Sequence, residues 1–265
     1  MRTYRILLSF STLLVAIVVA YTAFIFVYTD HMFTPPALLA APSSEAPASP
    51  WQAPLTPFIH KVNTPQRAQQ KDEAYNGFEV DIWVEGEQLL AAHDQQETLR
   101  KITLSDIFAA VKNPGTKSWW LDLKRPLTPQ MLQHILQLAQ QYHIPAENLL
   151  FEVEPGPTAQ LIKKENLGLL LPLPEGFEQD QADPKIRARL NKQALDLWQE
   201  YRPAAVSASF GKYTYLRAYF PQMPKAIYYS STQRPSLKKS FMRKHMQSDP
   251  SVKIFMTDEY TWINF

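Results

Sequence analysis

Two carboxylates stand two residues apart in the segment GFEVDIW. The alternation of apolar residues in this segment predicts a β-strand that carries Glu79 and Asp81 on one face. Their side chains would lie roughly 6 to 7 Å apart along the strand, so they can share one cation. Burying carboxylates among Phe78, Val80 and Ile82 is costly unless a positive charge neutralises them. The pair therefore predicts a bound metal ion or a cationic substrate group.

The same spacing recurs in WWLDLK, where Asp122 and Lys124 end another expected strand. This arrangement places an acid and an ammonium together. The chain has no cysteine, so a metal bound here would have oxygen ligands, which favour Mg²⁺ or Ca²⁺ over zinc.

Two histidines are expected near these acids. His60 closes an expected strand in PFIHKVNT, and a hairpin turning at Glu85 and Gly86 would bring His93 of LLAAHD to the same rim. Imidazole titrates close to neutral pH, so one histidine can deprotonate an attacking hydroxyl while the other protonates a leaving alkoxide. A cation and Lys124 would counter the charge that builds on phosphoryl oxygens. These residue types together predict phosphodiester cleavage.

These side chains need a scaffold of strands that all end at one rim. Short β-branched or aromatic runs alternate with segments of helical period, and they predict strands at 58–60, 78–83, 118–123, 149–153, 168–173, 204–209, 225–230 and 252–257. Helix starts are expected at Thr103, which forms a capping box with Asp106, and at Thr128 before Pro129. Strands separated by helices favour a parallel (β/α)8 TIM barrel over 57–265, with its active site at the C-terminal rim.

A doubly wound open sheet is the competing fold. Its glycine-rich phosphate loops are missing from a chain with only seven glycines, which favours the barrel. The small net charge of +2 argues against a nucleic-acid partner.

The composition of the N-terminal segment predicts a membrane anchor. The run from Ile6 to Tyr28 is uncharged and apolar, and Arg2 and Arg5 precede it. Residues 1–30 are therefore expected to form a cytoplasmic stub and a transmembrane helix in the inner membrane, with the rest of the chain in the periplasm. A cleaved signal peptide followed by secretion is the alternative. Residues 31–56, rich in Pro, Ala and Ser, are expected to be an extended linker.

The order of these motifs resembles the glycerophosphodiester phosphodiesterase family, within the phosphatidylinositol-phospholipase-C-like superfamily. Its members carry a His-Arg near the start, a Glu-x-Asp after a glycine, a His-Asp, a Glu-x-Lys and a final strand that commonly ends in Thr-Asp, as in VKIFMTDEYTWI here. The resemblance implies that His60 and His93 form the acid/base pair. It also implies that Glu79, Asp81 and Asp122 hold the cation.

Three features depart from the family pattern or point to one branch. Lys61 stands where the family usually has arginine, and together with Lys124 it is the expected phosphate contact. Asp122 replaces a glutamate and is one methylene shorter. The stretch HKVNTPQRA is similar to the HAVNS-type opening of the menorin-related branch.

Further candidates follow later strands. Glu152 and Glu154 end the expected fourth strand in FEVE, and Tyr228, Ser230 and Arg234 follow the seventh, where barrels often bind phosphate.

Three functions follow as alternatives. The first is a Mg²⁺- or Ca²⁺-dependent phosphodiesterase acting on glycerophosphodiesters or lipid headgroups. The second, suggested by Lys61 and Asp122, is a catalytically inactive, membrane-tethered barrel that binds or assembles other molecules. The third is a glycoside hydrolase, because barrels also mount carboxylate pairs for that reaction, but it leaves the two histidines unexplained.

Overall fold

The structure is a computed structural model that describes residues 12–24, 56–174, 176–177, 183–229 and 237–258. Residues 12–24, inside the expected membrane span, form a helix. Residues 31–55 of the expected linker lie outside the described residues. In the described ranges, no helix combines the length and the apolar character needed to span a bilayer.

In the residues that the structure describes, eight parallel strands form a closed barrel, and one further strand is antiparallel to its neighbour. In the described part of the chain the strands are β1 Thr56–Ile59, β2 Gly77–Glu85, β3 Gln88–Ala91, β4 Ser118–Leu123, β5 Leu149–Glu152, β6 Gly168–Pro172, β7 Ala205–Ser209, β8 Lys225–Tyr229 and β9 Val252–Thr257. Every parallel strand pairs with its neighbours in chain order, and β1 pairs with both β2 and β9, which closes the cylinder. The predicted TIM barrel is confirmed, and each predicted strand is present within two residues of its expected ends.

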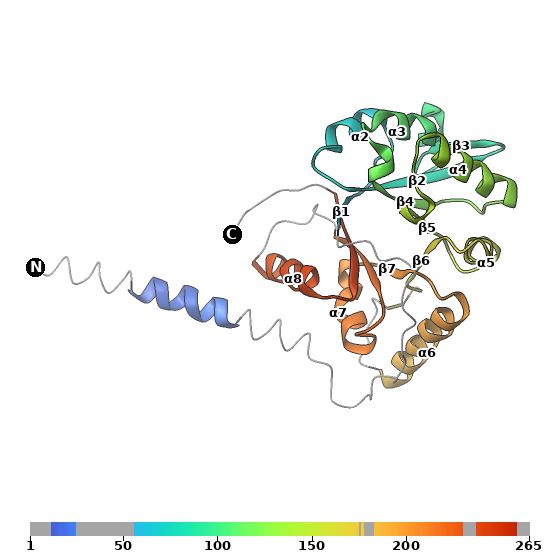
Figure 1. Cartoon of the computed structure of the whole chain (residues 1–265). Coiled ribbons are helices and arrows are strands. Elements are labelled where there is room, and N and C mark those ends of the chain that lie inside the picture. The colour runs from blue at the N-terminus through green and yellow to red at the C-terminus, as the bar shows by residue number, and fades with distance from the viewer. Residues whose placement is uncertain (1–11, 25–55, 175, 178–182, 230–236, 259–265) are drawn as a thin grey trace, which may run out of the picture.

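Helices connect the strands and surround them (Figure 1). They are α2 Pro65–Lys71, α3 Leu104–Ala110, α4 Pro129–Gln141, α5 Pro157–Lys164, α6 Pro184–Tyr201, α7 Phe210–Tyr219 and α8 Leu237–Ser248. Shorter 3-10 turns cover Glu97–Arg100, Pro114–Thr116 and Ala146–Asn148. The capping box of Thr103 with Asp106 is confirmed, as is the start of α4 at Thr128 and Pro129.

The barrel interior changes from apolar to polar along its axis. One inward side chain from almost every parallel strand joins an apolar plug, which consists of Phe58, Trp120, Leu150, Leu170, Ala205, Ala226, Ile254 and Met256, with Ala204 beside it. Because strand side chains alternate, the residue two positions further on also points inward. That next layer carries the polar groups His60, Asp122, Glu152, Ser207, Tyr228 and Asp258. The strand period alone thus gathers polar side chains at the C-terminal mouth.

Strand β2 makes room for the plug with a glycine. A Cβ atom at Gly77 would lie 2.4 Å from the ring of Phe58, so a side chain does not fit there. The two following inward positions of β2 are Glu79 and Asp81, both buried. A small residue at the bottom of this strand therefore lets a bulky aromatic fill the barrel directly beneath two acids.

The expected hairpin is confirmed as β2 and β3. It turns at Gly86, whose φ of 59° is a left-handed conformation that favours glycine, and β3 returns antiparallel to β2. The backbone N–H of Ala92 then donates to the carbonyl of Asp81 over 3.0 Å. This bond fixes the start of the segment that carries His93.

A buried lysine lies at the first position of β8, at the end of the barrel opposite the mouth. Lys225 is 0% exposed, and its ammonium donates to the carbonyls of Pro221 and Met223 over 3.2 and 2.9 Å and to the Ser251 hydroxyl over 2.6 Å. Burial lowers the pKa of Lys225 to about 8. The three acceptors hold the charged form at neutral pH.

This lysine predicts a specific dependence of stability on pH. Between pH 8 and the ordinary lysine value of 10.5, the unfolded chain keeps a proton that folded Lys225 has released, so stability rises with pH. We expect the free energy of unfolding to gain about 2 kcal/mol from this residue between pH 7 and pH 10. The measurement is chemical denaturation across that range for the wild type and Lys225→Met, which should lack the gain. Parallel profiles would show that Lys225 titrates normally.

Candidate active site at the barrel mouth

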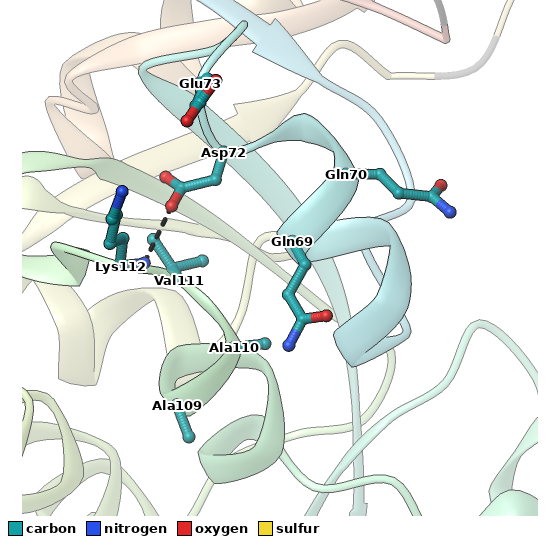
Figure 2. Close-up of a pocket in the computed structure, with 8 residues that line it drawn as sticks. All are labelled: Gln69, Gln70, Asp72, Glu73, Ala109, Ala110, Val111 and Lys112. Atoms are coloured by element: carbon teal, nitrogen blue, oxygen red, sulfur yellow. Dashed lines mark hydrogen bonds between the residues drawn. The ribbon is translucent and has the colours of Figure 1, made fainter.

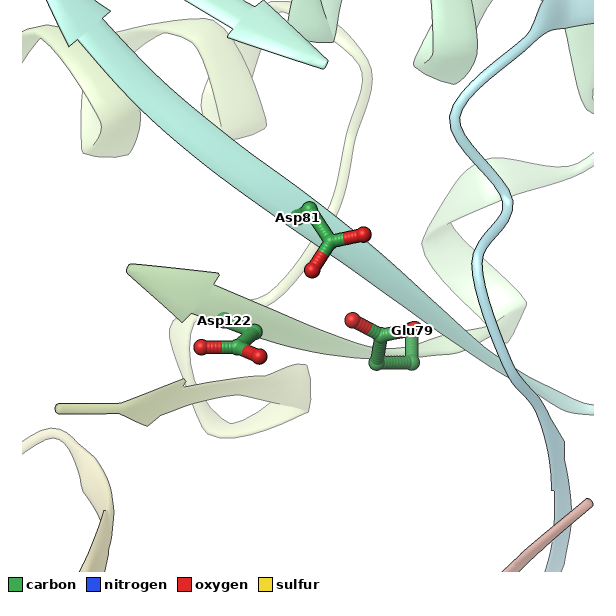
Figure 3. Close-up of side chains that lie close together, drawn as sticks. All are labelled: Glu79, Asp81 and Asp122. Atoms are coloured by element: carbon green, nitrogen blue, oxygen red, sulfur yellow. The ribbon is translucent and has the colours of Figure 1, made fainter. Parts of the chain in front are cut away.

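Three carboxylates converge at the mouth. Glu79 and Asp81 project from β2 and Asp122 from β4, and one oxygen of each lies within 4.8 Å of the others (Figure 3). The register places Asp81 directly beside Asp122 in the parallel pair. Glu79 and Asp81 are each 1% exposed, whereas Asp122 is partly open to the mouth. The three acids that the family resemblance implied are therefore brought together. We refer to Glu79, Asp81 and Asp122 jointly as the carboxylate group.

Glu79 is the deepest of the three and is only partly satisfied. The backbone N–H of Lys61, which has a left-handed φ of 56°, donates to Glu79 Oε2 over 2.5 Å. Glu79 Oε1 is buried without a hydrogen-bond partner among the described residues. Burial, with the added charges of Asp81 and Asp122, raises the pKa of Glu79 well above its usual value. An acid in this setting requires a proton or a cation.

Asp81 is the best-supported acid of the site. Asn63 donates to its Oδ2 over 2.6 Å and accepts its backbone N–H over 3.0 Å. Its Oδ1 lies 2.7 Å from the ammonium of Lys124 and 3.0 Å from Nδ1 of His93. Burial alone would raise the pKa of Asp81, but Lys124 and these hydrogen bonds outweigh it and lower the pKa. Asp81 is therefore ionised at neutral pH.

Asp122 and Lys124 form a direct ion pair at the end of β4. Burial raises the pKa of Asp122, and the nearby charge of Asp81 acts in the same direction against the opposing effect of Lys124. Burial would lower the pKa of Lys124, but its two carboxylate partners raise it above the ordinary value. Lys124 therefore stays protonated at neutral pH and places a positive charge between two acids.

His60 is held by a partner from the other end of the chain. Its Nδ1 lies 2.7 Å from Oδ1 of Asp258, and its Nε2 lies 3.8 Å from Glu79. Tyr228 donates to the same Asp258 oxygen over 2.7 Å and packs against the imidazole with ring centroids 4.3 Å apart. Arg67 donates to the backbone carbonyls of His60 and Asp258. Burial lowers the pKa of His60, an effect that Asp258 opposes.

His93 stands on the open side of the same acids. Its Nδ1 contacts Asp81, while its side chain is 44% exposed. Its backbone N–H donates to Glu97 over 2.8 Å, which ties the segment to the following turn. The hairpin brings His93 to these acids, as predicted. Both histidines thus contact the carboxylate group, His60 at Glu79 and His93 at Asp81.

Glu152 extends the polar layer across the barrel. It accepts hydrogen bonds from the indole N–H of Trp120 over 2.8 Å and from the hydroxyl of Ser207. Desolvation and the neighbouring charge of Asp122 raise the pKa of Glu152 to about 7. Two donors from β4 and β7 thus hold this acid inside the mouth.

The other sequence candidates are placed differently. The side chain of Lys61 is exposed, so its described contact with the site is through its backbone N–H. Glu154 is exposed beyond the end of β5. Ser230 and Arg234 lie outside the described residues.

Sequence reasoning did not select Asn63, Ser207 or Asp258 as site residues. The strand period offered a signal for Ser207 and Asp258, since each lies two positions beyond an apolar plug residue. Asn63 lies in the loop after β1, and its role appears only once that loop is placed over Asp81.

A separate shallow pocket lies on the outer side of the protein between α2 and α3 (Figure 2). Gln69, Asp72, Ala110 and Lys112 are among its lining residues, and the backbone N–H of Lys112 donates to Asp72. None of its lining residues belongs to the carboxylate group. The two sites are therefore distinct.

The sequence matches no family model, and no curated protein is significantly similar to it. Solved structures are similar in fold. A dihydropteroate synthase from Coxiella burnetii in complex with pteroic acid is 10% identical with a TM-score of 0.50, over 78% of this chain and 89% of that one. A glycerophosphodiester phosphodiesterase from Parabacteroides distasonis is 11% identical with a TM-score of 0.49, over 77% and 92%. An orotidine 5'-monophosphate decarboxylase from Methanocaldococcus jannaschii is 12% identical with a TM-score of 0.43, over 78% and 89%. At these identities the comparison shows the shared barrel fold and leaves the reaction to be argued from the site.

Proposed function

We propose that this barrel is a divalent-cation-dependent phosphodiesterase. The observation that carries the proposal is the convergence of three carboxylates with two histidines at one mouth of the barrel. Barrel enzymes place catalytic residues from several strand ends at this rim.

The carboxylate group fits a hard divalent ion. Its three oxygens come within 4.8 Å of one another, which is close to the spacing of oxygens around one Mg²⁺ or Ca²⁺ ion that binds them at about 2.0 to 2.6 Å. The unpartnered Oε1 of Glu79 supplies an acceptor that no described protein group satisfies. A bound ion would supply charge stabilisation for the phosphoryl oxygens. Glu79, Asp81 and Asp122 would hold it.

The two histidines fit the proton transfers. Asp258 accepts from Nδ1 of His60 and leaves Nε2 as the free nitrogen on the Glu79 side. Asp81 does the same for His93, whose exposed ring faces the solvent side of the mouth. One imidazole removes the proton of the attacking hydroxyl, and the other protonates the departing alkoxide. Each contacts a carboxylate that can hold the orientation and tautomer of its ring.

The proposed substrates are glycerophosphodiesters or phosphodiester lipid headgroups. An anchor in the first 30 residues would hold the barrel in the periplasm next to such lipids, which is the location we propose. The order of the motifs from His60 to Lys124 supports this substrate class through its likeness to the family pattern.

The test is hydrolysis of a glycerophosphodiester, whose alkoxide leaving group needs a proton, by the purified full-length chain with Mg²⁺ or Ca²⁺ and then with a chelator. We expect chelation to stop turnover and His60→Ala and His93→Ala each to lower kcat by about 100-fold or more. His134→Ala is the matched control, because His134 is exposed on α4. Turnover that survives chelation and both substitutions would exclude this mechanism.

One observation favours a second function, a catalytically inactive barrel that binds or assembles other molecules. Lys124 already neutralises Asp81 and Asp122, so part of the acidic charge is balanced without a metal. The same assay separates the two functions, because an inactive barrel would show no turnover with any added cation.

A further inference from the structure

Lys124 lies where a divalent cation would also have to bind. Its ammonium is 2.7 Å from Asp81 Oδ1 and also contacts Asp122 Oδ2. Both acids belong to the carboxylate group, whose third member has an oxygen without a described partner. In the described residues, the ammonium of Lys124 thus contacts two of the three acids, and one oxygen of the third, Glu79 Oε1, has no hydrogen-bond partner.

Two cations cannot share these oxygens at low cost. The acids are largely buried, so repulsion between an ammonium and a divalent ion at contact distance is weakly screened. Lysine has a flexible stem of four carbons, and the side chain of Lys124 is 19% exposed on the mouth side. The ammonium therefore has a route away from the acids without a change in the backbone.

We propose that Lys124 is an internal competitor of the metal ion, bound to Asp81 and Asp122 when the ion is absent and released from them when it binds. The inference rests on the cation site of the proposed function but not on hydrolysis. The affinity for the metal then includes the loss of two ion pairs. Release also places a positive charge at the mouth when the site becomes loaded, where a phosphodiester anion would bind.

The test is calorimetric titration of the full-length protein with Mg²⁺ and with Ca²⁺ alone, without substrate. Lys124→Met should tighten the dissociation constant by about tenfold or more, because the competing charge is removed. Lys124→Arg keeps the charge and should stay within about threefold of the wild type. Lys164→Met is the matched loss of charge, since Lys164 is exposed in the last turn of α5 and belongs to no part of the site; it should change the affinity little.

The outcomes separate this inference from the proposed function. Thermal unfolding checks that each variant is folded, and Lys124→Gln repeats the neutralisation with a polar side chain. Unchanged or weaker binding in both neutral variants, or no binding in any protein, overturns the competition. Binding in the neutral variants but not in the wild type supports the competition while contradicting the cation-dependent phosphodiesterase.

Discussion

Glu79→Gln is expected to abolish cation-dependent hydrolysis and at the same time to stabilise the fold. Glu79 is 1% exposed beside two other acids, and its raised pKa shows that the ionised form is disfavoured there. Glutamine keeps an oxygen for the Lys61 N–H and removes the buried charge. It also removes the ligand that the cation needs.

The two effects should have opposite signs. Activity should fall by at least about a thousandfold, because metal stabilisation of phosphoryl charge contributes several kcal/mol. The free energy of unfolding without metal should rise by about 1 to 2 kcal/mol as the like-charge repulsion is relieved. Denaturant unfolding measures the change in stability, and the hydrolysis assay measures the change in activity. Glu154→Gln, at an exposed acid, is the control and should change neither. Loss of stability together with activity would mean that Glu79 serves the fold instead of a metal.

Most of the fold can be predicted from the spacing of hydrophobic residues in the sequence. Hydrophobic residues around Phe78, Trp119 and Leu149 alternate with polar ones or form continuous runs, as in buried strands. The predicted ends of these strands lie within two residues of the observed ends. The first strand begins two residues before its predicted start, because Thr56 and Pro57 pair with β9 and no local pattern marks that pairing. Closure of the barrel is a long-range property that short patterns predict only through the count of strands.

The candidate site also contains local contacts that the sequence predicts and long-range contacts that it does not. Glu79, Asp81 and His93 lie within one hairpin, so strand period and a glycine turn were enough to bring them together. The contact of His60 with Asp258 spans 198 positions and exists only because β9 pairs with β1. The sequence predicts that the side chain of Lys61 binds phosphate, whereas the described contact of this residue with the site is made by its backbone N–H, which a side-chain motif cannot reveal.

The contact between Asp258 and His60 leads to the second prediction, a large loss of kcat when Asp258 is replaced by asparagine. Asp258 accepts from Nδ1 of His60, which leaves the lone pair on Nε2 on the Glu79 side. Asp258→Asn offers an amide that can donate to Nδ1 and so favours the opposite tautomer. We expect kcat to fall by about 100- to 10,000-fold with a small change in KM, the range seen when a catalytic histidine loses its orienting carboxylate.

Tyr228→Phe separates orientation from packing. It removes another hydrogen bond to the same Asp258 oxygen but keeps the aromatic ring against His60 and the carboxylate on Nδ1. If Asp258 acts through the tautomer of His60, Tyr228→Phe should cost only a few-fold in kcat, since a neutral hydrogen bond contributes about 1 kcal/mol. Nitrogen NMR of the imidazole should then report protonated Nδ1 in the wild type and Tyr228→Phe, and protonated Nε2 in Asp258→Asn. Equal losses in the two variants with an unchanged tautomer would mean that Asp258 only supports the packing between β8 and β9. His60 would then lose its assignment as a proton-transferring residue oriented by Asp258.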